Sequence, residues 1–389
     1  TSAVETTLNA MPREYRRAEA RTCDGGPGRE EEAGANAAIG CRCGGSIGER
    51  AMTRVLIITG ANVGARMSGP AIRASAMARV LAADGHDVTL VTTGVLEAGH
   101  HPSAYRATHV APRDRRSFAR LHDVAELIVF QGHAMEQFPR LARSDRVVVA
   151  DAYDPMHLEM LEQARDEPRA TWELVVGQRV ALLNQQLARA DLILCASERQ
   201  RSFYLGQLAA LGRVSPTTYV GDPTLESLLA IAPFGIDGTR PTKDSPALRG
   251  VLPGVDDSAR VLVWGGGIYP WFDPVLLIEA TDALAKRRPL TRLVFLGTTT
   301  PGNEPMGIVK DAMDRARELG ALGSSVVFNE GWIPYDERGA FFLDADAGVS
   351  THHAHLETEF SFRTRILDYL WAGLPMVVTE GDTFADLVR

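Results

Sequence analysis

Cysteine is scarce in this chain, and its distribution excludes a disulfide-stabilised fold. Three of the four cysteines, Cys23, Cys41 and Cys43, lie in the first 50 residues, so the rest of the chain holds one. The Cys41/Cys43 pair has no second pair or histidine at zinc-finger spacing, and we predict no zinc site there. Cys195 ends the apolar run 191–195 and is predicted to be a small buried side chain.

Basic charge and long apolar runs are lacking as well. The formal net charge is -8, whereas non-specific nucleic-acid binding needs a basic face, so we predict no nucleic-acid partner. No uncharged apolar run approaches the roughly 20 residues that span a bilayer, and the first residues are too polar for a signal peptide. We therefore expect a cytoplasmic protein.

The composition leaves room for more than one core. With 389 residues and 45% hydrophobic content, the chain is long enough for two or three domains. Residues 1–51 show no apolar periodicity, and we interpret them as a disordered or non-native leader. Met52 precedes a buried-strand pattern at 55–59 and is predicted to be the natural start.

Short β-rich runs alternate with amphipathic stretches from Val55 onward, which is typical of parallel α/β structure. A helix is expected between Pro70 and Gly85. The predicted strands of the first half are 55–59, 87–92, 126–131, 146–151 and 191–195. A second series follows a segment rich in proline and glycine, with strands at 261–264, 293–296, 325–328, 347–350 and 376–379.

These two series predict an α/β fold with two Rossmann-like domains facing a cleft. The first domain covers 52–238, a linker covers 239–256, and the second domain covers 257–389. A ligand is expected between the domains, at the carboxyl ends of the strands. Because the second series stops right after a strand, we expect the second domain to be truncated at its carboxyl end.

A glycine-containing loop, Gly60–Pro70, lies between the first strand and the first helix. Glycine lets the backbone approach a ligand, and the amide end of a helix favours anionic or hydroxyl-rich groups, which makes Ser68 and Gly69 candidate binding residues. A purely structural turn is the equal alternative. The glycine spacing does not fit G-x-G-x-x-G, so NAD binding is disfavoured.

A second glycine-rich loop follows the first strand of the second domain and contains Gly265, Gly266 and Gly267. Their amides can face a diphosphate, while Tyr269 and Trp271 can line a base or sugar pocket. The alternative is a tight turn beside core aromatics. Three adjacent glycines lose more conformational entropy than a plain turn requires, which favours function.

The segment 350–375 carries a third group of candidates. Phe362 and Ile366 begin a stripe at helical spacing that continues to Leu370, which predicts a helix starting near Ser361. Its amino end would place Ser361, Phe362, Arg363 and Arg365 near phosphate groups. Asp368 lies off the stripe, where its carboxylate can accept hydrogen bonds from ribose hydroxyls.

Several histidines are further candidates. Alternation along an extended chain would place His353, His355 and Glu357 on one side, as a zinc or manganese site requires. Hydrogen bonding beside a cleft is the more common role of such loop histidines, and we expect no metal. His133 follows a predicted strand end and therefore faces the expected cleft, although a lone histidine is more often structural.

From Val55 onward, the chain resembles glycosyltransferase family four, retaining enzymes of the GT-B fold, in the order of its segments. The matching segments are 68–73, 85–92, 191–198, 232–237, 331–335, 344–350 and 367–379. The last of them resembles the end of the family's E-x7-E motif. With Ser197–Arg201, the chain also resembles bacterial polysaccharide and cell-surface glycan transferases.

The resemblance implies transfer of a hexose from a nucleotide diphosphate sugar to a glycan or lipid-linked acceptor. It implies no cofactor and no metal, with the donor held mainly by the second domain and the acceptor by the first. Trp332 and Ile333 lie in the segment that resembles the family's base-binding region. Contact with the inner face of the membrane would then occur through the acceptor.

The resemblance also assigns site residues and marks two departures. It implies that His133 lies beside the donor sugar. Asp368 stands where the motif's second glutamate is usual, and the first is replaced by Phe360, which leaves Glu357 and Glu359 as candidate catalytic carboxylates.

The second departure concerns positive charge. The family's basic pair after the first strand of the second domain is replaced by Gly267 and Phe272, so the phosphate charge must be met by Arg363, Arg365 and helix amides. Two other functions stay open at this point. They are a GT-B-like sugar-nucleotide epimerase and a non-catalytic binding module of a glycan-assembly complex.

Overall fold

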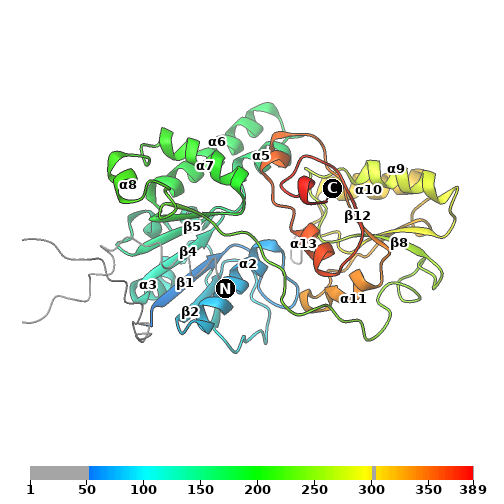
Figure 1. Ribbon diagram of the computed structural model, residues 1–389, viewed down its shortest axis with the longest axis horizontal. Coiled ribbons are helices and arrows are strands. Elements are labelled where there is room, and N and C mark those ends of the chain that lie inside the picture. Colours follow the sequence, from blue (N-terminus) through cyan, green and yellow to red (C-terminus); the bar gives the residue numbers. More distant parts are fainter. Residues whose placement is uncertain (1–51, 300–303, 389) are drawn as a thin grey trace, which may run out of the picture.

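The computed structural model describes residues 52–299 and 304–388, which form two α/β domains (Figure 1). The first domain holds a seven-stranded sheet in the order β3-β2-β1-β4-β5-β6-β7, and the second a five-stranded sheet in the order β10-β9-β8-β11-β12. Neighbouring strands in both sheets are parallel. Such doubly wound sheets bind ligands at the carboxyl edge, where the strand order reverses. The leader predicted at 1–51 lies outside the described residues.

The strands confirm the sequence prediction. The first sheet contains β1 (Arg54–Thr59), β2 (Asp87–Thr92), β3 (Arg106–His109), β4 (Leu127–Gln131), β5 (Val147–Asp151), β6 (Leu192–Cys195) and β7 (Leu229–Ile231). The second contains β8 (Arg260–Trp264), β9 (Thr291–Phe295), β10 (Val326–Phe328), β11 (Ala347–Ser350) and β12 (Met376–Val378). The edge strands β3 and β7 were not predicted: β3 has the mixed sequence Arg-Ala-Thr-His without a buried residue, and in β7 only Leu229 is buried.

The helices cover both faces of the sheets. Those of the first domain are α2 (Gly69–Ala83), α3 (Arg115–Val124), α4 (Ala134–Gln137), α5 (Met156–Gln163), α6 (Arg169–Arg189), α7 (Glu198–Ala210) and α8 (Pro216–Gly221), with the 3-10 turn η2 (Pro139–Arg143). Those of the second are α9 (Pro274–Ala285), α10 (Gly307–Glu318), α11 (Arg338–Leu343), α12 (Leu356–Phe360), α13 (Thr364–Trp371) and α14 (Ala385–Val388), with the 3-10 turn η3 (Tyr335–Glu337).

The central strands of each sheet are buried on both faces, which explains their continuous apolar runs. In β1, Leu56 and Ile58 join one core layer, whereas Val55 and Ile57 join the layer on the opposite face. The second domain has two layers of its own. The two domains therefore have separate cores.

The helix predicted to start near Ser361 starts three residues later, at Thr364. The short helix α12 ends at Phe360, and the Ser361 hydroxyl donates back to the carbonyl of Thr358 at 2.9 Å, which breaks the helical path. Ile366 is buried as predicted, but Leu370 is 40% exposed. The prediction that the apolar stripe continues inward to Leu370 was therefore wrong.

Much of the segment predicted as a linker, 239–256, packs onto the second domain. Leu248 and Val255 belong to that domain's core. The buried carboxylate of Asp344 accepts hydrogen bonds from the backbone amides of residues 247–249 and from the Lys243 ammonium. The part of the chain that connects the two domains is therefore shorter than the predicted linker.

None of the helices in 52–299 and 304–388 is both long and apolar enough to cross a bilayer.

Candidate functional site

A cavity lies between the two domains, at the carboxyl edges of both sheets. The first domain lines it with Met67, Ser68, Gly69, Ile72, Phe234 and Gly235. The second domain lines it with Gly265, Gly266, Gly267, Tyr269, Leu296, Gly297, Trp332, Ile333, Tyr335, Arg338, Phe342, Thr364, Arg365, Leu367 and Asp368. The cavity is therefore where the topology predicts a ligand.

Nine of the predicted site residues line this cavity: Ser68, Gly69, Gly265, Gly266, Gly267, Trp332, Ile333, Arg365 and Asp368. The other predicted residues lie outside its lining: His133, Glu357, Glu359, Ser361, Phe362 and Arg363. The structure thus brings together the two glycine loops, the predicted base-binding segment and part of α13. The predicted catalytic side chains of His133, Glu357 and Glu359 are not part of the cavity lining.

The glycine loop after β8 is shaped by close packing. A Cβ on Gly265 would lie 3.0 Å from the Phe342 ring, and Gly266 has a φ of +83°, which disfavours any side chain. The Gly265 amide donates to the Tyr369 hydroxyl at 2.9 Å. Because this amide is already engaged, packing explains Gly265, and its amide does not face a ligand.

Arg365 is the strongest electrostatic feature of the cavity. Its side chain is 7% exposed and stacks on Trp264 and Phe272, with the guanidinium carbon 4.2 and 4.1 Å from the ring centroids. One terminal nitrogen donates to the Gly267 carbonyl at 2.9 Å, and the other has no hydrogen-bond partner in the described part of the chain. Burial lowers the pKa of Arg365 to about 10.

No carboxylate within 52–299 or 304–388 forms an ion pair with Arg365. A buried guanidinium without a counter-charge is unfavourable unless an anion or another acceptor meets it. The buried nitrogen without a hydrogen-bond partner therefore suits an anionic ligand, and a phosphate group matches the geometry of a guanidinium.

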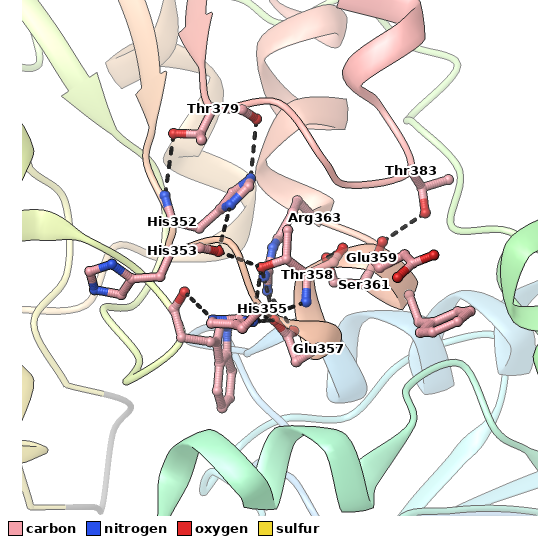
Figure 2. Close-up of polar contacts among 12 residues, drawn as sticks. His352, His353, His355, Glu357, Thr358, Glu359, Ser361, Arg363, Thr379 and Thr383 are labelled. Atoms are coloured by element: carbon pink, nitrogen blue, oxygen red, sulfur yellow. Dashed lines mark hydrogen bonds and ion pairs between the residues drawn. The ribbon is translucent and has the colours of Figure 1, made fainter. Parts of the chain in front are cut away.

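Arg363, the other predicted phosphate partner, is already neutralised. Its two terminal nitrogens lie 2.9 and 2.6 Å from the two carboxylate oxygens of Glu357 (Figure 2). Both side chains are buried. The pair joins α12 to the start of α13, so its visible role is to fix that turn, whereas Glu359 is exposed on α12.

The loop histidines each bond a different neighbour (Figure 2). His352 contacts the Thr379 carbonyl at 3.1 Å. His355 accepts from the Thr358 amide at 3.2 Å and contacts the Trp271 carbonyl at 3.1 Å. The carboxylate of Asp273 lies 3.4 Å from His353, and that of Glu357 lies 3.7 Å from His355. Among the described residues, no group of three or more His, Cys, Asp and Glu side chains is placed to hold a metal ion.

His133 directly precedes the short helix α4, just past the carboxyl end of β4, and its side chain makes no capping hydrogen bond. Its ring lies 3.3 Å from the Glu136 carboxylate, and burial, helped by the charge of Arg179, lowers its pKa. A neutral ring suits hydrogen bonding to a hydroxyl. The placement of His133 beside a donor sugar stays a prediction, since the ring is not part of the cavity lining.

Arg338 is a cavity residue that sequence reasoning missed. It donates to Asp368 at 3.0 Å, and its guanidinium lies 3.6 Å from the Tyr335 ring centroid and 4.4 Å from that of Trp371. Burial raises the pKa of Asp368, and Arg338 opposes that shift. The only sequence signal was a cation shortly after the predicted base-binding segment, which is too common to be diagnostic.

Two hydrogen bonds to backbone carbonyls beside the cavity connect the two domains. The Trp332 indole donates to the Met67 carbonyl at 3.3 Å, and the Tyr335 amide donates to the Ala65 carbonyl at 2.8 Å. The glycine-containing loop of the first domain thus touches the predicted base-binding segment of the second. A ligand in the cavity would contact both domains.

The two facing Rossmann-like domains and the cavity between them define the GT-B fold. No family model and no curated protein matches the chain, but solved structures share its fold. Anabaena HepE in complex with UDP and glucose matches with a TM-score of 0.56 and 15% identity, over 87% of this chain and 83% of that one.

Two further structures match with the same TM-score. One is the E. coli trehalose-6-phosphate protein bound with UDP-2-fluoro glucose, with 0.56, 12% identity and 86% coverage of both chains. The other is a UDP-forming trehalose-phosphate synthase from Burkholderia xenovorans, with 0.56, 11% identity and 86% coverage of both chains. At these identities the likeness establishes the fold.

Proposed function

We propose that the chain is a retaining glycosyltransferase that resembles family four and transfers a hexose from a nucleotide diphosphate sugar to a glycan or lipid-linked acceptor. The observation that carries this proposal is the buried guanidinium of Arg365, which has no ion pair with the described residues and one nitrogen without a hydrogen-bond partner among them, beside a cavity between two Rossmann-like domains. Structures of this fold that hold UDP with glucose or UDP-2-fluoro glucose support the choice of ligand.

In this proposal Arg365 meets the diphosphate of the donor. The guanidinium would stabilise the negative charge that grows on the leaving nucleotide diphosphate as the bond to the sugar breaks. Asp368, held by Arg338 at 3.0 Å, would accept hydrogen bonds from the ribose. Trp332 and Ile333 would flank the base, and Ser68 and Gly69 would face the transferred sugar or the acceptor.

Retention fits a site without a protein nucleophile, because the acceptor can attack from the face that the nucleotide leaves. His133 would position a sugar hydroxyl, and Glu359 is the candidate carboxylate that Arg363 does not neutralise. Glu357 would act by holding Arg363 and the turn before α13. No cofactor or metal is part of the proposal.

The proposal is tested by nucleotide binding to residues 52–389 and to an Arg365→Met variant. Thermal shift against UDP, ADP and GDP and their sugars should give a shift with one base, since a ligand of the folded state raises its stability by about 2.7 kcal/mol at 100 times Kd. Arg365→Met should weaken that binding at least about tenfold. Arg260→Met, whose side chain is 75% exposed, is the control.

The apo protein supplies the second readout. Removing a buried uncompensated charge should leave the melting temperature of ligand-free Arg365→Met equal to or above that of the wild type. A lower apo melting temperature together with undiminished nucleotide binding would show that Arg365 is only structural. If no nucleotide shifts the wild type, the proposal fails.

A non-catalytic binding module is the second candidate. Its support is that Arg338, the other cation of the cavity lining, is paired with Asp368. Release of free nucleotide from the donor, followed by coupled detection, distinguishes the two functions. Donor binding without nucleotide release, with and without glycan acceptors, would favour the binding module.

A further inference from the structure

The motif Ser197–Arg201, at the start of α7, has no part in the cavity but contacts the second domain. The Ser197 hydroxyl accepts from the Gln200 amide at 3.2 Å and caps the helix. In the first turn, Arg199 donates from one terminal nitrogen to the carbonyls of Gly381 and Asp382, at 2.8 and 3.1 Å. A longer contact, 3.4 Å, reaches the Glu359 carbonyl.

Gln200 makes a second connection at the same place. Its side chain is fully buried, and its amide nitrogen donates to the Tyr153 carbonyl at 2.7 Å and to the Phe360 carbonyl at 2.8 Å. The first acceptor follows β5 in the first domain, whereas the second ends α12 in the second domain. The Phe203 ring adds a contact with the Phe360 ring at 4.6 Å between centroids.

The end of α12 leads directly to Arg365. Phe360 is followed by Ser361, whose carbonyl accepts from the Thr383 hydroxyl at 2.8 Å, and then by Arg363, which is bound to Glu357 on α12. Arg365 is the second residue of α13. The position of α12 against α7 therefore sets the position of the anion site.

We propose that Arg199 and Gln200 are positioning residues, which fix α12 to the first domain and thereby place Arg365 for the anionic part of the donor. The part of this inference that concerns the donor rests on the proposed function, whereas the contact of Arg199 and Gln200 with the second domain does not depend on it. Opening of the domains would break the bonds of Arg199 and Gln200 and release the turn before α13.

The test compares Arg199→Met with Arg201→Met. Both replace an arginine in the first turns of α7 by an unbranched side chain, but Arg201 donates to the Thr224 carbonyl within the first domain. Amide hydrogen exchange over 353–365 is measured without ligand, and the affinities for UDP, ADP and GDP are measured by calorimetry.

For Arg199→Met we expect exchange over 353–365 to accelerate about tenfold and the affinity for the nucleotide that binds to fall about three- to tenfold, which is the effect of lost charge-assisted hydrogen bonds. Arg201→Met should match the wild type in both measurements. Arg199→Lys, which retains a charged donor, should recover most of the protection and most of the affinity.

Unchanged exchange and unchanged affinity in Arg199→Met would overturn the proposal, as would equal effects in Arg201→Met. Circular dichroism establishes that each variant is folded, and Arg199→Gln replaces the Met variant if that one unfolds. If the wild type binds none of the three nucleotides, the proposed function fails, whereas the exchange comparison still decides whether Arg199 fixes α12.

Discussion

At the scale of single residues, the two arginines of the 361–365 segment show how burial divides roles that the sequence leaves equal. Both are buried, but Arg363 forms an ion pair with the Glu357 carboxylate, whereas Arg365 forms none with the described residues. A sequence pattern cannot distinguish them, because the difference depends on which side chain α12 places opposite. In the structure, Glu357 neutralises the charge of Arg363, whereas Arg365 lines the cavity, where it can meet a ligand.

The Glu357–Arg363 pair yields a stability prediction. Glu357→Gln should lower the free energy of unfolding by about 3–5 kcal/mol, because it leaves Arg363 buried without its partner. The double variant Glu357→Leu with Arg363→Met should recover most of that loss. Urea unfolding measures both, and Glu359→Gln, at an exposed site on the same helix, is the control. A Glu357→Gln variant that is as stable as the wild type would contradict the structural role.

A pair of half-buried carboxyl groups, Asp154 and Glu159, lies in the loop before α5 and on α5, close to Glu357. Burial raises the pKa of Glu159 well above its usual range, with Asp154 and Glu357 adding to the shift, and burial raises the pKa of Asp154 to about 6. The unfolded chain releases these protons near pH 4. Because the folded chain holds them longer, stability falls as the pH rises from about 4 through the folded pKa values.

Glu159→Gln should therefore remove part of this pH dependence. Between pH 5 and pH 8 the wild type should lose more stability than the variant, so the variant gains relative stability at pH 8. Melting temperatures at the two pH values measure the effect, with the exposed Glu167→Gln as control. Parallel pH profiles of wild type and Glu159→Gln would contradict the shifted pKa.

At the scale of elements, sequence patterns predicted strands better than turns. The central strands are buried on both faces, so their apolar runs were visible, and each predicted strand is confirmed. The break at Ser361 was not visible, since it depends on hydrogen bonds with Thr358 and Thr383. Arg338 was missed for the same kind of reason, because its partner Asp368 lies 30 residues away.

The segment 239–256 gives a prediction at this scale. Burial alone would raise the pKa of Asp344, but hydrogen bonds from Lys243 and three backbone amides outweigh it and hold the pKa below the usual range. Its stabilising effect is thus present above about pH 4 and is lost as the pH falls. Asp344→Asn should cost about 1.5–3 kcal/mol at pH 7.

The deficit of Asp344→Asn should shrink as the pH falls below about 4, because the carboxylate is then protonated in the unfolded wild-type chain but not yet in the folded one, which lowers the stability of the wild type. Urea unfolding at pH 7 and pH 3.5 measures it. Asp256→Asn, in the same segment and with a side chain that is 76% exposed, should behave like the wild type. A deficit of the same size at both pH values would contradict the ionic origin of the effect.

At the scale of the whole molecule, two separate double-layered cores are joined by a short crossing, by the contacts of Trp332 and Tyr335, and by the Arg199–Gln200 contact with α12. Chains with independent cores depart from two-state unfolding.

We expect calorimetry to give a ratio of calorimetric to van't Hoff enthalpy above one. Arg199→Met should separate the two transitions further, because it removes part of the contact between the domains. A bound nucleotide should bring the transitions together, since it contacts both domains and stabilises only the arrangement in which they meet. A ratio of one for both the wild type and Arg199→Met would show that the interface, and not the separate cores, governs cooperativity.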